Sequence, residues 1–268
     1  HRLRFPYAAV SDESRLIVAD TSNNRVLLWH GLPRAGAGLP ADTVLGPHLA
    51  TDPGAPLVTH YDLAAPSRVE LSATSTANWA AKIAGLLRDE VGVLPGDAVV
   101  CDLPAHWLTA GVVLGAWWAG AEVVTGGAGA DAAVAVVTVP ERLDAHPAAV
   151  ETLLMTTHPM GLPLAASGVD LPPGVTDLAE ACRIHPDAFV PSGAGTAALD
   201  GAALAELADP ALRGQRVLVA DPGPGTDAVA VLARVLASGA SAVLVTGSDA
   251  DPDRVAEVAA TEHTTATA

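Results

Sequence analysis

The 268-residue sequence combines a high apolar content with a strong negative charge, and together these exclude two broad classes of protein. Hydrophobic residues make up 50% of the chain, which rules out a disordered acidic chain because disorder goes with low hydrophobicity. The formal net charge is −16 and the arginines are scattered, so the sequence offers no basic patch for nucleic acid. Aromatic residues reach only 3%, so we expect a core of Ala, Val and Leu, which suits parallel strands covered by helices.

The N-terminal residues differ in pattern from the rest. Residues 15–20 and 25–29 have the composition of two short strands, and the polar residues between them predict the turn of a β-hairpin. The string RLIVADTSNNRVLLW resembles the NHL repeat, a β-propeller blade motif, and the resemblance extends over residues 5–45. One blade cannot bury its own faces, so residues 1–46 are predicted to be an orphan, blade-like β segment.

A Gly/Pro-rich linker over residues 31–56 is predicted to join this segment to an α/β domain over residues 47–268. The chain opens without the basic and apolar regions of a secretory signal peptide, so a cytoplasmic protein is expected. Cys101 and Cys182 lie far apart in apolar surroundings. They are therefore predicted to be buried, reduced thiols rather than parts of a disulfide or a zinc site.

Residues 70–91 are predicted to form an amphipathic helix. Ser72 is the predicted N-cap, because its hydroxyl can accept a hydrogen bond from a free backbone N–H of the first turn. Apolar residues at helical spacing form one face of this helix: Trp79, Ile83, Leu86, Leu87 and Val91. A turn containing Gly and Pro then leads into a strand over residues 98–101.

Two segments about 120 residues apart share one pattern of strand, loop, helix, glycine turn and strand. They run over residues 96–126 and 214–247, and each predicts a βαβ unit whose crossover helix joins two parallel strands. The apolar stretch at residues 107–124 has the length of a membrane span, but the matching helix of the second unit carries Asp227 and Arg234. Both are therefore predicted to be crossover helices, with no membrane association.

Further strands are predicted at residues 132–139 and 150–156, and a short helix at residues 200–208. The predicted fold class is thus α/β, with a layered and largely parallel sheet of βαβ units and crossover helices. The short β-hairpin segment precedes it.

From residue 49 to about residue 250 the sequence resembles the N-terminal subdomain of AMP-binding, or adenylate-forming, enzymes, which include the acyl-CoA synthetases. The matching phrases are VELSATSTANWAAKIAGLL, GVLPGDAVVCDLPAHWLTAGVVLGAWWAGAEVV, DAFVPSGAGTAALDGAAL and RVLVADPGPGTDAVAVLARVLASGASAVLV. The chain is most similar to a family of short, stand-alone proteins from high-GC bacteria that have no assigned activity. The resemblance implies a nucleotide or acyl ligand.

The resemblance also implies a phosphate-binding loop at residues 191–199, where the family pattern reads S/T-S-G-T-T-G-x-P-K. Small residues let backbone N–H groups approach the phosphates, and hydroxyls add donors. The positions that keep this character are the predicted ATP- or AMP-binding residues: Ser192, Gly193, Gly195 and Thr196. The lysine of the loop is missing, and the chain's one lysine, Lys82, is predicted to lie in the helix over residues 70–91, away from the loop. A degenerate loop, rather than a complete ATP-dependent synthetase, is expected.

A second glycine pattern, with Gly223 and Gly225, follows a predicted strand and opens a helix. Together with Asp249 it fits a Rossmann loop, so an NAD-type dinucleotide site stays open as an alternative, although the carboxylate of Asp221 would repel a pyrophosphate. His106 begins a crossover helix at the edge where α/β ligands bind. It is predicted to be a polar helix cap, with a general-base role as the alternative.

The function expected from the sequence is weak binding of a nucleotide or acyl ligand by a degenerate, non-catalytic adenylate-forming-like domain. The alternatives are a protein-interaction or structural module without a ligand, open to a protein partner or to self-association, and the dinucleotide binder. No catalytic residue, no metal site, no nucleic-acid partner and no membrane partner are predicted.

Overall fold

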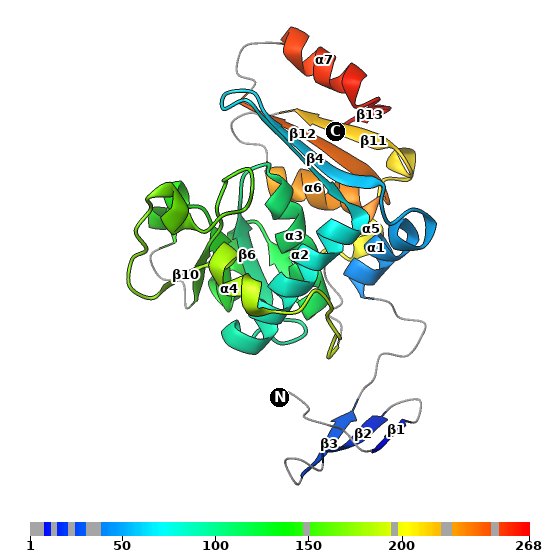
Figure 1. The fold of residues 1–268 in the computed structure, drawn as a ribbon, viewed down its shortest axis with the longest axis vertical. Coiled ribbons are helices and arrows are strands. Elements are labelled where there is room, and N and C mark those ends of the chain that lie inside the picture. The colour runs from blue at the N-terminus through cyan, green and yellow to red at the C-terminus, as the bar shows by residue number, and fades with distance from the viewer. Residues whose placement is uncertain are drawn as a thin grey trace.

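The computed structural model describes residues 8–11, 15–20, 25–30, 39–146, 151–193, 198–220, 227–247 and 252–268 (Figure 1). These residues form a small N-terminal sheet and two five-stranded sheets, with helices packed between the two larger sheets. The predicted α/β class with parallel βαβ units is confirmed. The strands form two large sheets, however, where the sequence predicted one.

The N-terminal sheet is antiparallel and consists of three strands in chain order: β1 (Ala8–Ser11), β2 (Arg15–Asp20) and β3 (Arg25–His30). Strands β2 and β3 pair along their whole length, which confirms the predicted hairpin. Strand β1 was not predicted.

The first large sheet has the strand order β10-β9-β8-β6-β7, and all of its neighbours run parallel. Its strands are β6 (Ala98–Asp102), β7 (Glu122–Val124), β8 (Ala135–Thr138), β9 (Thr152–Leu154) and β10 (Val175–Asp177). The predicted strands at residues 132–139 and 150–156 are confirmed as β8 and β9. The short helices η3 (Gly127–Ala132), η4 (Pro140–Ala145) and η5 (Leu164–Ser167) lie between these strands, and α4 (Leu178–Ala181) and η6 (Cys182–Ile184) follow β10.

The second large sheet has the order β13-β11-β12-β4-β5 and is parallel except for the β4–β5 hairpin. Its strands are β4 (Pro56–Asp62), β5 (Ser67–Ser72), β11 (Arg216–Ala220), β12 (Ser241–Thr246) and β13 (Ala266–Thr267). Successive residues of β11 point to opposite faces: Val217 and Val219 join the large core between the sheets, and Leu218 packs on the outer face. Both faces are apolar, as is typical of a parallel sheet covered on both sides.

The helices outside the first sheet's short connections are α1 (Pro40–Thr51), α2 (Ala73–Leu86), α3 (Trp107–Ala119), α5 (Leu204–Leu207), η7 (Pro210–Leu212), α6 (Ala228–Ala237) and α7 (Pro252–Thr261). The π-helical turn η2 (Leu87–Val91) continues α2. The helix predicted from residue 70 begins at Ala73, because the residues before it belong to β5. Ser72 is its N-cap as predicted, with Oγ accepting a hydrogen bond from the Ser75 N–H at 3.1 Å.

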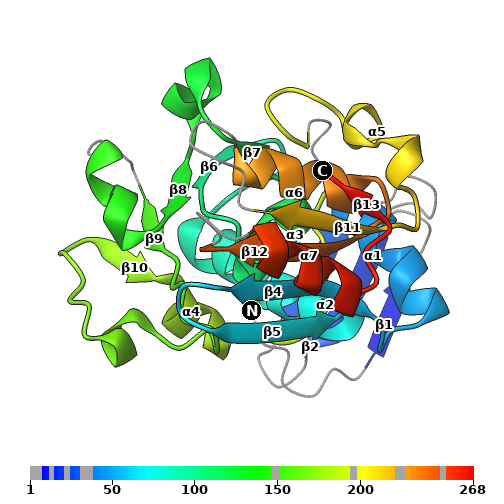
Figure 2. The same ribbon diagram turned by 90° about the horizontal axis from the view of Figure 1, so that it is seen from above.

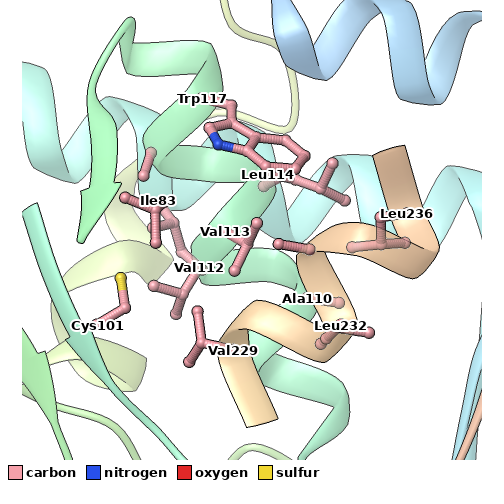
Figure 3. Close-up of a cluster of buried hydrophobic side chains, with 14 of the residues drawn as sticks. Ile83, Cys101, Ala110, Val112, Val113, Leu114, Trp117, Val229, Leu232 and Leu236 are labelled. Carbon is pink, nitrogen blue, oxygen red and sulfur yellow. The ribbon is translucent and has the colours of Figure 1, made fainter. Parts of the chain in front are cut away.

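Helix α3 is the central element of the fold. It packs against β4 and β5 of one sheet and against β6 and β7 of the other, and every residue of α3 except Trp118 is buried. Its side chains meet those of α2, β6 and α6 in one apolar cluster (Figure 3). Gly115 allows α2 and α3 to approach closely, since a Cβ there would lie 2.9 Å from Ile83 Cβ. The high hydropathy of this segment is therefore explained by burial between two sheets.

No helix within the described parts of the chain has both the length and the apolar character needed to cross a membrane.

The linker predicted over residues 31–56 is partly helical, and this is a correction. Helix α1 occupies most of its second half and packs against α2, α3 and α6, with Ala41, Val44 and Leu45 buried. Pro40 begins α1, where its missing N–H removes no helical hydrogen bond. The predicted domain boundary after residue 46 falls inside α1.

The outer face of the second sheet is covered by α7, which lies across β11, β12 and β4 (Figure 2). Val258 of α7 packs there with Leu218 and Val243. Just after α7, the buried carboxylate of Glu262 accepts hydrogen bonds from Arg216, Arg68 and Tyr61. Burial acts to raise the pKa of Glu262, but the hydrogen bonds from these three residues outweigh it and lower the pKa to about 2.

Candidate functional site

Two of the four predicted phosphate-binding residues, Ser192 and Gly193, lie beside the C-terminal end of α3. Ser192 is exposed and Gly193 is half-buried, whereas Gly195 and Thr196 lie outside the described residues. A Cβ on Gly193 would lie 3.0 Å from Pro95 Cγ, and a Cβ on Gly120 would lie 3.0 Å from the Gly193 carbonyl oxygen. The absence of side chains at these glycines lets the segment pack closely against the turn before β6.

Two cations of the α2–η2 helix hold the segment that leads to Ser192. Lys82 Nζ donates to the His185 carbonyl oxygen and pairs with Asp187, both at 2.9 Å, so the lysine lies closer to this segment than the sequence indicated. Arg88 donates to the Val190 carbonyl oxygen at 2.7 Å, and its guanidinium also pairs with a neighbouring aspartate. No strand precedes Ser192 over the described residues 185–193, which departs from the strand-then-loop order of the AMP-binding family.

Carboxylates hold the chain where it continues after the undescribed residues 194–197. Asp200 accepts hydrogen bonds from the backbone N–H and the hydroxyl of Thr125, at 2.9 and 2.8 Å. Glu122 accepts a hydrogen bond from the N–H of Gly201. Asp200 adopts a left-handed backbone conformation, with φ of 46°, that fits the tight turn it forms with Gly201. The acidic side chains Asp187 and Asp200, on described residues on either side of the predicted loop, already have hydrogen-bond or ion-pair partners. The same is true of the two cations, Lys82 and Arg88, that contact the segment before the loop.

Of the alternative dinucleotide site, the structure describes only the start of α6, the helix that follows the glycine pattern. Gly223, Gly225 and Asp249 lie outside the described residues, but Asp227 is the N-cap of α6. Its carboxylate accepts hydrogen bonds from the N–H groups of Val229 and Ala230, at 2.9 and 3.1 Å. In a dinucleotide fold these donors and the positive end of the helix would face a pyrophosphate. A carboxylate that occupies them disfavours this alternative.

A cluster of four aromatic rings lies at the other end of α3, and sequence reasoning missed most of it. The rings of His60 and His106 are 4.8 Å apart in a T-shaped arrangement, and those of His106 and Trp107 are 5.3 Å apart. Trp79 of α2 stands edge-on to Trp107, also at 5.3 Å. The signal for His60 was available, because a histidine inside the apolar strand β4 is a polar residue where burial is expected.

His106 is the N-cap of α3, as predicted, with Nδ1 accepting a hydrogen bond from the Leu108 N–H at 3.2 Å. Burial lowers the pKa of His106 to about 3, and repulsion from His60 contributes. Burial likewise lowers the pKa of His60 to about 4, while its Nε2 lies 2.9 Å from the hydroxyl of Thr246. Both rings are therefore neutral at pH 7 and are weak bases, so the geometry gives no support to a general-base role.

The described start of the predicted loop, Ser192 and Gly193, and the ring cluster lie at opposite ends of α3. The helix has 13 residues, which corresponds to a length of about 20 Å. His106 follows the carboxyl end of β6, the edge at which open α/β sheets bind ligands. Ser192 and Gly193 lie beside Pro95, at the amino end of the same strand. These residues thus form two separate places and not one site.

A further polar group lies at the carboxyl end of β6. The carboxylate of Asp102 pairs with Arg142 at 2.6 Å and with His146 at 3.0 Å, which ties η4 to the strand. Partial burial acts to raise the pKa of Asp102, but the hydrogen bonds from His146 and Arg142 lower it below its usual value.

The cysteines are free and buried, as predicted, and burial raises the pKa of Cys101 and of Cys182, the latter to about 11. Over the described residues, no group of three or more His, Cys, Asp or Glu side chains could hold a metal ion.

Comparison with known proteins establishes the family. A protein of Mycobacterium tuberculosis named as a TIGR03089 family protein is 40% identical over 236 residues, which cover 83% of this chain and 95% of that protein. The chain belongs to the TIGR03089 family. No model of a known protein family matches the sequence, so the NHL repeat predicted for residues 5–45 is unsupported.

Solved structures place this family member in the fold of acyl-CoA synthetases. The acyl-CoA synthetase of Brucella canis matches 87% of the chain at 17% identity and a TM-score of 0.66, and the acetoacetyl-CoA synthetase of Streptomyces lividans matches 85% at 17% identity and 0.66. The peptide synthetase FmoA3, in its AMPPNP-bound form, matches 87% at 23% identity and 0.59. The chain spans 47%, 42% and 25% of these three solved chains, less than half of each. At such identities the likeness establishes the fold alone.

Proposed function

We propose that this protein is a non-catalytic ligand-binding domain of the adenylate-forming type, which binds a nucleotide or an acyl group weakly through the loop that contains Ser192 and Thr196. The observation that supports weak binding is electrostatic. The two cations that contact the segment before the loop, Lys82 and Arg88, are already engaged with carboxylates and carbonyl oxygens. Beyond the loop, Asp200 adds a negative charge.

Adenylation develops negative charge on a phosphorus centre, and enzymes stabilise it with lysine, arginine or a metal ion aimed at that centre. In this chain the one lysine is held to Asp187, and the position that matches the family's loop lysine is Leu199, which is buried. A triphosphate is therefore disfavoured relative to a ligand with less charge. AMP and acyl groups are the ligands that fit this balance.

The ligand class is also supported by the solved chains with this fold. FmoA3 is described with AMPPNP bound, and the anthranilate CoA ligase AuaEII is described in complex with anthranoyl-AMP. Both ligands contain an adenylate group, and the second also contains an acyl group.

A thermal-shift titration with AMP, ATP–Mg²⁺, NAD and an acyl-CoA tests the proposal. A ligand present at 100 times its Kd stabilises the folded state by about 2.7 kcal/mol, which raises the melting temperature measurably. We expect AMP or the acyl-CoA to give a shift that disappears in a Ser192→Ala/Thr196→Ala variant. The matched control is Ser167→Ala, an exposed serine on η5, which should leave the shift unchanged.

The other outcomes distinguish the alternatives. A shift with NAD alone would contradict the proposal and favour the glycine pattern after β11. The absence of a shift with all four ligands would favour the interaction module, for which Ile184 and Val190, each 73% exposed, are the first contact residues to test.

A further inference from the structure

Residues 185–190, called the strap below, lead into the predicted loop without forming a helix or a strand. A segment of this kind has no ladder of backbone hydrogen bonds, so its backbone groups need partners from elsewhere. At one end, Lys82 Nζ donates to the His185 carbonyl oxygen at 2.9 Å. At the other end, Arg88 donates to the Val190 carbonyl oxygen at 2.7 Å. Both ends of the strap are therefore held by side chains of the continuous α2–η2 helix.

The imidazole of His185 packs into a notch on α2. A Cβ on Gly85 would lie 2.8 Å from Nδ1 and 3.0 Å from Cγ of this ring, so only glycine leaves room for it. Nε2 lies 2.8 Å from Glu90 Oε1, and because a carboxylate only accepts, the ring donates this hydrogen bond. Glycine inside a helix is less favourable than alanine. The presence of Gly85 is thus explained by its contact with the ring and not by helix stability.

Further contacts hold the strap from the same side. Lys82 pairs with Asp187 at 2.9 Å, and the Arg88 guanidinium lies 4.3 Å from the centre of the Phe189 ring. Arg88 belongs to the π-helical turn η2, and such turns are rare and occur frequently at functional sites. Ion pairs as exposed as Lys82–Asp187 contribute little stability. These contacts can be lost without unfolding α2, because the apolar side of that helix packs on α3.

The strap determines where Ser192 lies. The chain is fixed at Val190 by Arg88, and three residues later Gly193 packs against Pro95, where an added Cβ would lie 3.0 Å from Pro95 Cγ. The exposed hydroxyl of Ser192 lies between these two points. A group that is already held in position binds its ligand more tightly than a mobile one, because less conformational freedom is lost on binding.

We propose that the strap regulates the affinity of the ligand site that begins at Ser192. When His185 occupies the notch at Gly85, Ser192 is held in position and the ligand binds. When the ring leaves the notch, binding is weaker. His185 is thus a positioning residue, and the ligand in turn favours the anchored strap. This inference rests on the proposed function, since it concerns the same site.

The first test removes the notch without touching the loop. The full chain and a Gly85→Ala variant are titrated by calorimetry with AMP and with acetyl-CoA. The added Cβ displaces the His185 ring, so we expect the probe that binds to lose at least about fivefold in affinity, the lower end of couplings between sites. The matched control is Gly46→Ala on α1, where a Cβ meets nothing within 4 Å and the affinity should be unchanged.

The second test uses a readout that a purely structural role would not move. Lys82→Met removes the contacts with the His185 carbonyl oxygen and with Asp187 but leaves the hydrogen bond from the ring to Glu90 as a reporter. In ¹⁵N-labelled chain at pH 7, the probe should move the His185 Nε2 resonance of this variant toward that of the original chain, because a ligand favours the state that binds it. Lys82→Arg can still donate and should retain the original affinity.

Equal affinity of Gly85→Ala and Gly46→Ala for the bound probe would overturn the proposal. If Gly85→Ala fails to fold, Lys82→Met decides, and an unchanged affinity or an unchanged His185 resonance on addition of the probe overturns it. Binding that is lost in Ser192→Ala but kept in Gly85→Ala rejects the role of the strap and leaves the proposed function in place. Absence of binding of both probes to the original chain rejects the proposed function, and the strap's role with it.

Discussion

The two βαβ units have the same topology, yet their helices lie in different surroundings. Helix α3 lies between two sheets and is buried almost throughout, whereas α6 has one buried face and an exposed Arg234. Their N-caps differ accordingly. His106, neutral and buried, begins α3, and Asp227, charged and half-buried, begins α6. A carboxylate is a good cap where water reaches it, but its burial would cost free energy of desolvation. The repeated sequence pattern thus determines the topology of both units, whereas the burial of each helix start determines whether a neutral or a charged residue can cap it.

The largest expected loss of stability comes from replacing one of two neighbouring tryptophans that lie on different sides of α3. Trp117 is fully buried and its Nε1 donates to the Ala198 carbonyl oxygen, whereas Trp118 is half-buried. Trp117→Ala should lower the free energy of unfolding by about 3–5 kcal/mol, because it leaves a large hole between the sheets. The control Trp118→Ala should cost about 1 kcal/mol. Urea denaturation measures both, and equal costs would show that α3 is not surrounded as described.

The second-largest expected loss of stability comes from lowering the pH, and it arises from the two buried histidines at the start of α3, His60 and His106. The pKa values of His60 and His106, about 4 and about 3, lie below the unfolded value of 6.5. The stability that depends on neutral rings is therefore complete above pH 6.5 and is lost as the pH falls toward 4 and 3. Between pH 7.5 and pH 5, each histidine should lower the free energy of unfolding by about 2 kcal/mol, because its ring binds a proton in the unfolded state but not in the folded state.

Denaturant titrations between pH 7.5 and 5 measure this loss. The double variant His60→Gln/His106→Asn should be much less sensitive to pH in this window. Below about pH 4.5 it should lose stability again, since Glu262 has its pKa lowered to about 2 and its ion pairs require the carboxylate. A chain whose stability is constant from pH 7.5 to 5 would contradict the burial of the two rings.

The smallest effects test the caps directly. Asp227→Asn keeps a side-chain oxygen at the start of α6 and removes only the charge, so we expect a loss below about 1 kcal/mol. His106→Asp keeps a capping oxygen but introduces a buried carboxylate, so we expect a loss of about 1–3 kcal/mol at pH 7. Thermal unfolding of the two variants at pH 7 gives the comparison. The proposed difference in environment fails if Asp227→Asn proves the more costly substitution.

Local patterns in the sequence predicted the repeating elements well. The strand–helix–strand order of both units and the cap at Ser72 are confirmed, because periodicity and capping depend on residues close in sequence. Helix α1 was not predicted, because the Gly and Pro residues around it are typical of a linker. The burial of Val44 and Leu45 against other helices stabilises it.

The candidate site was predictable only in part. The capping role of His106 followed from residue type and position, whereas the binding role of Ser192 stays a prediction. The pairing of Lys82 with Asp187, in the segment before the loop, could not be predicted from the sequence. The two residues are distant in sequence and meet only because α2 packs against η6 and the segment that follows it. The same applies to His60, whose contact with Thr246 spans 186 positions of the chain.

The sequence by itself determined the fold class, the hairpin at the N-terminus and the two βαβ units. These follow from composition and from short-range periodicity. Only the tertiary structure decided that the two units join different sheets, that α3 is enclosed between them, and that Ser192 and His106 lie at its opposite ends. Those features depend on contacts between residues far apart in the chain, which no local pattern encodes.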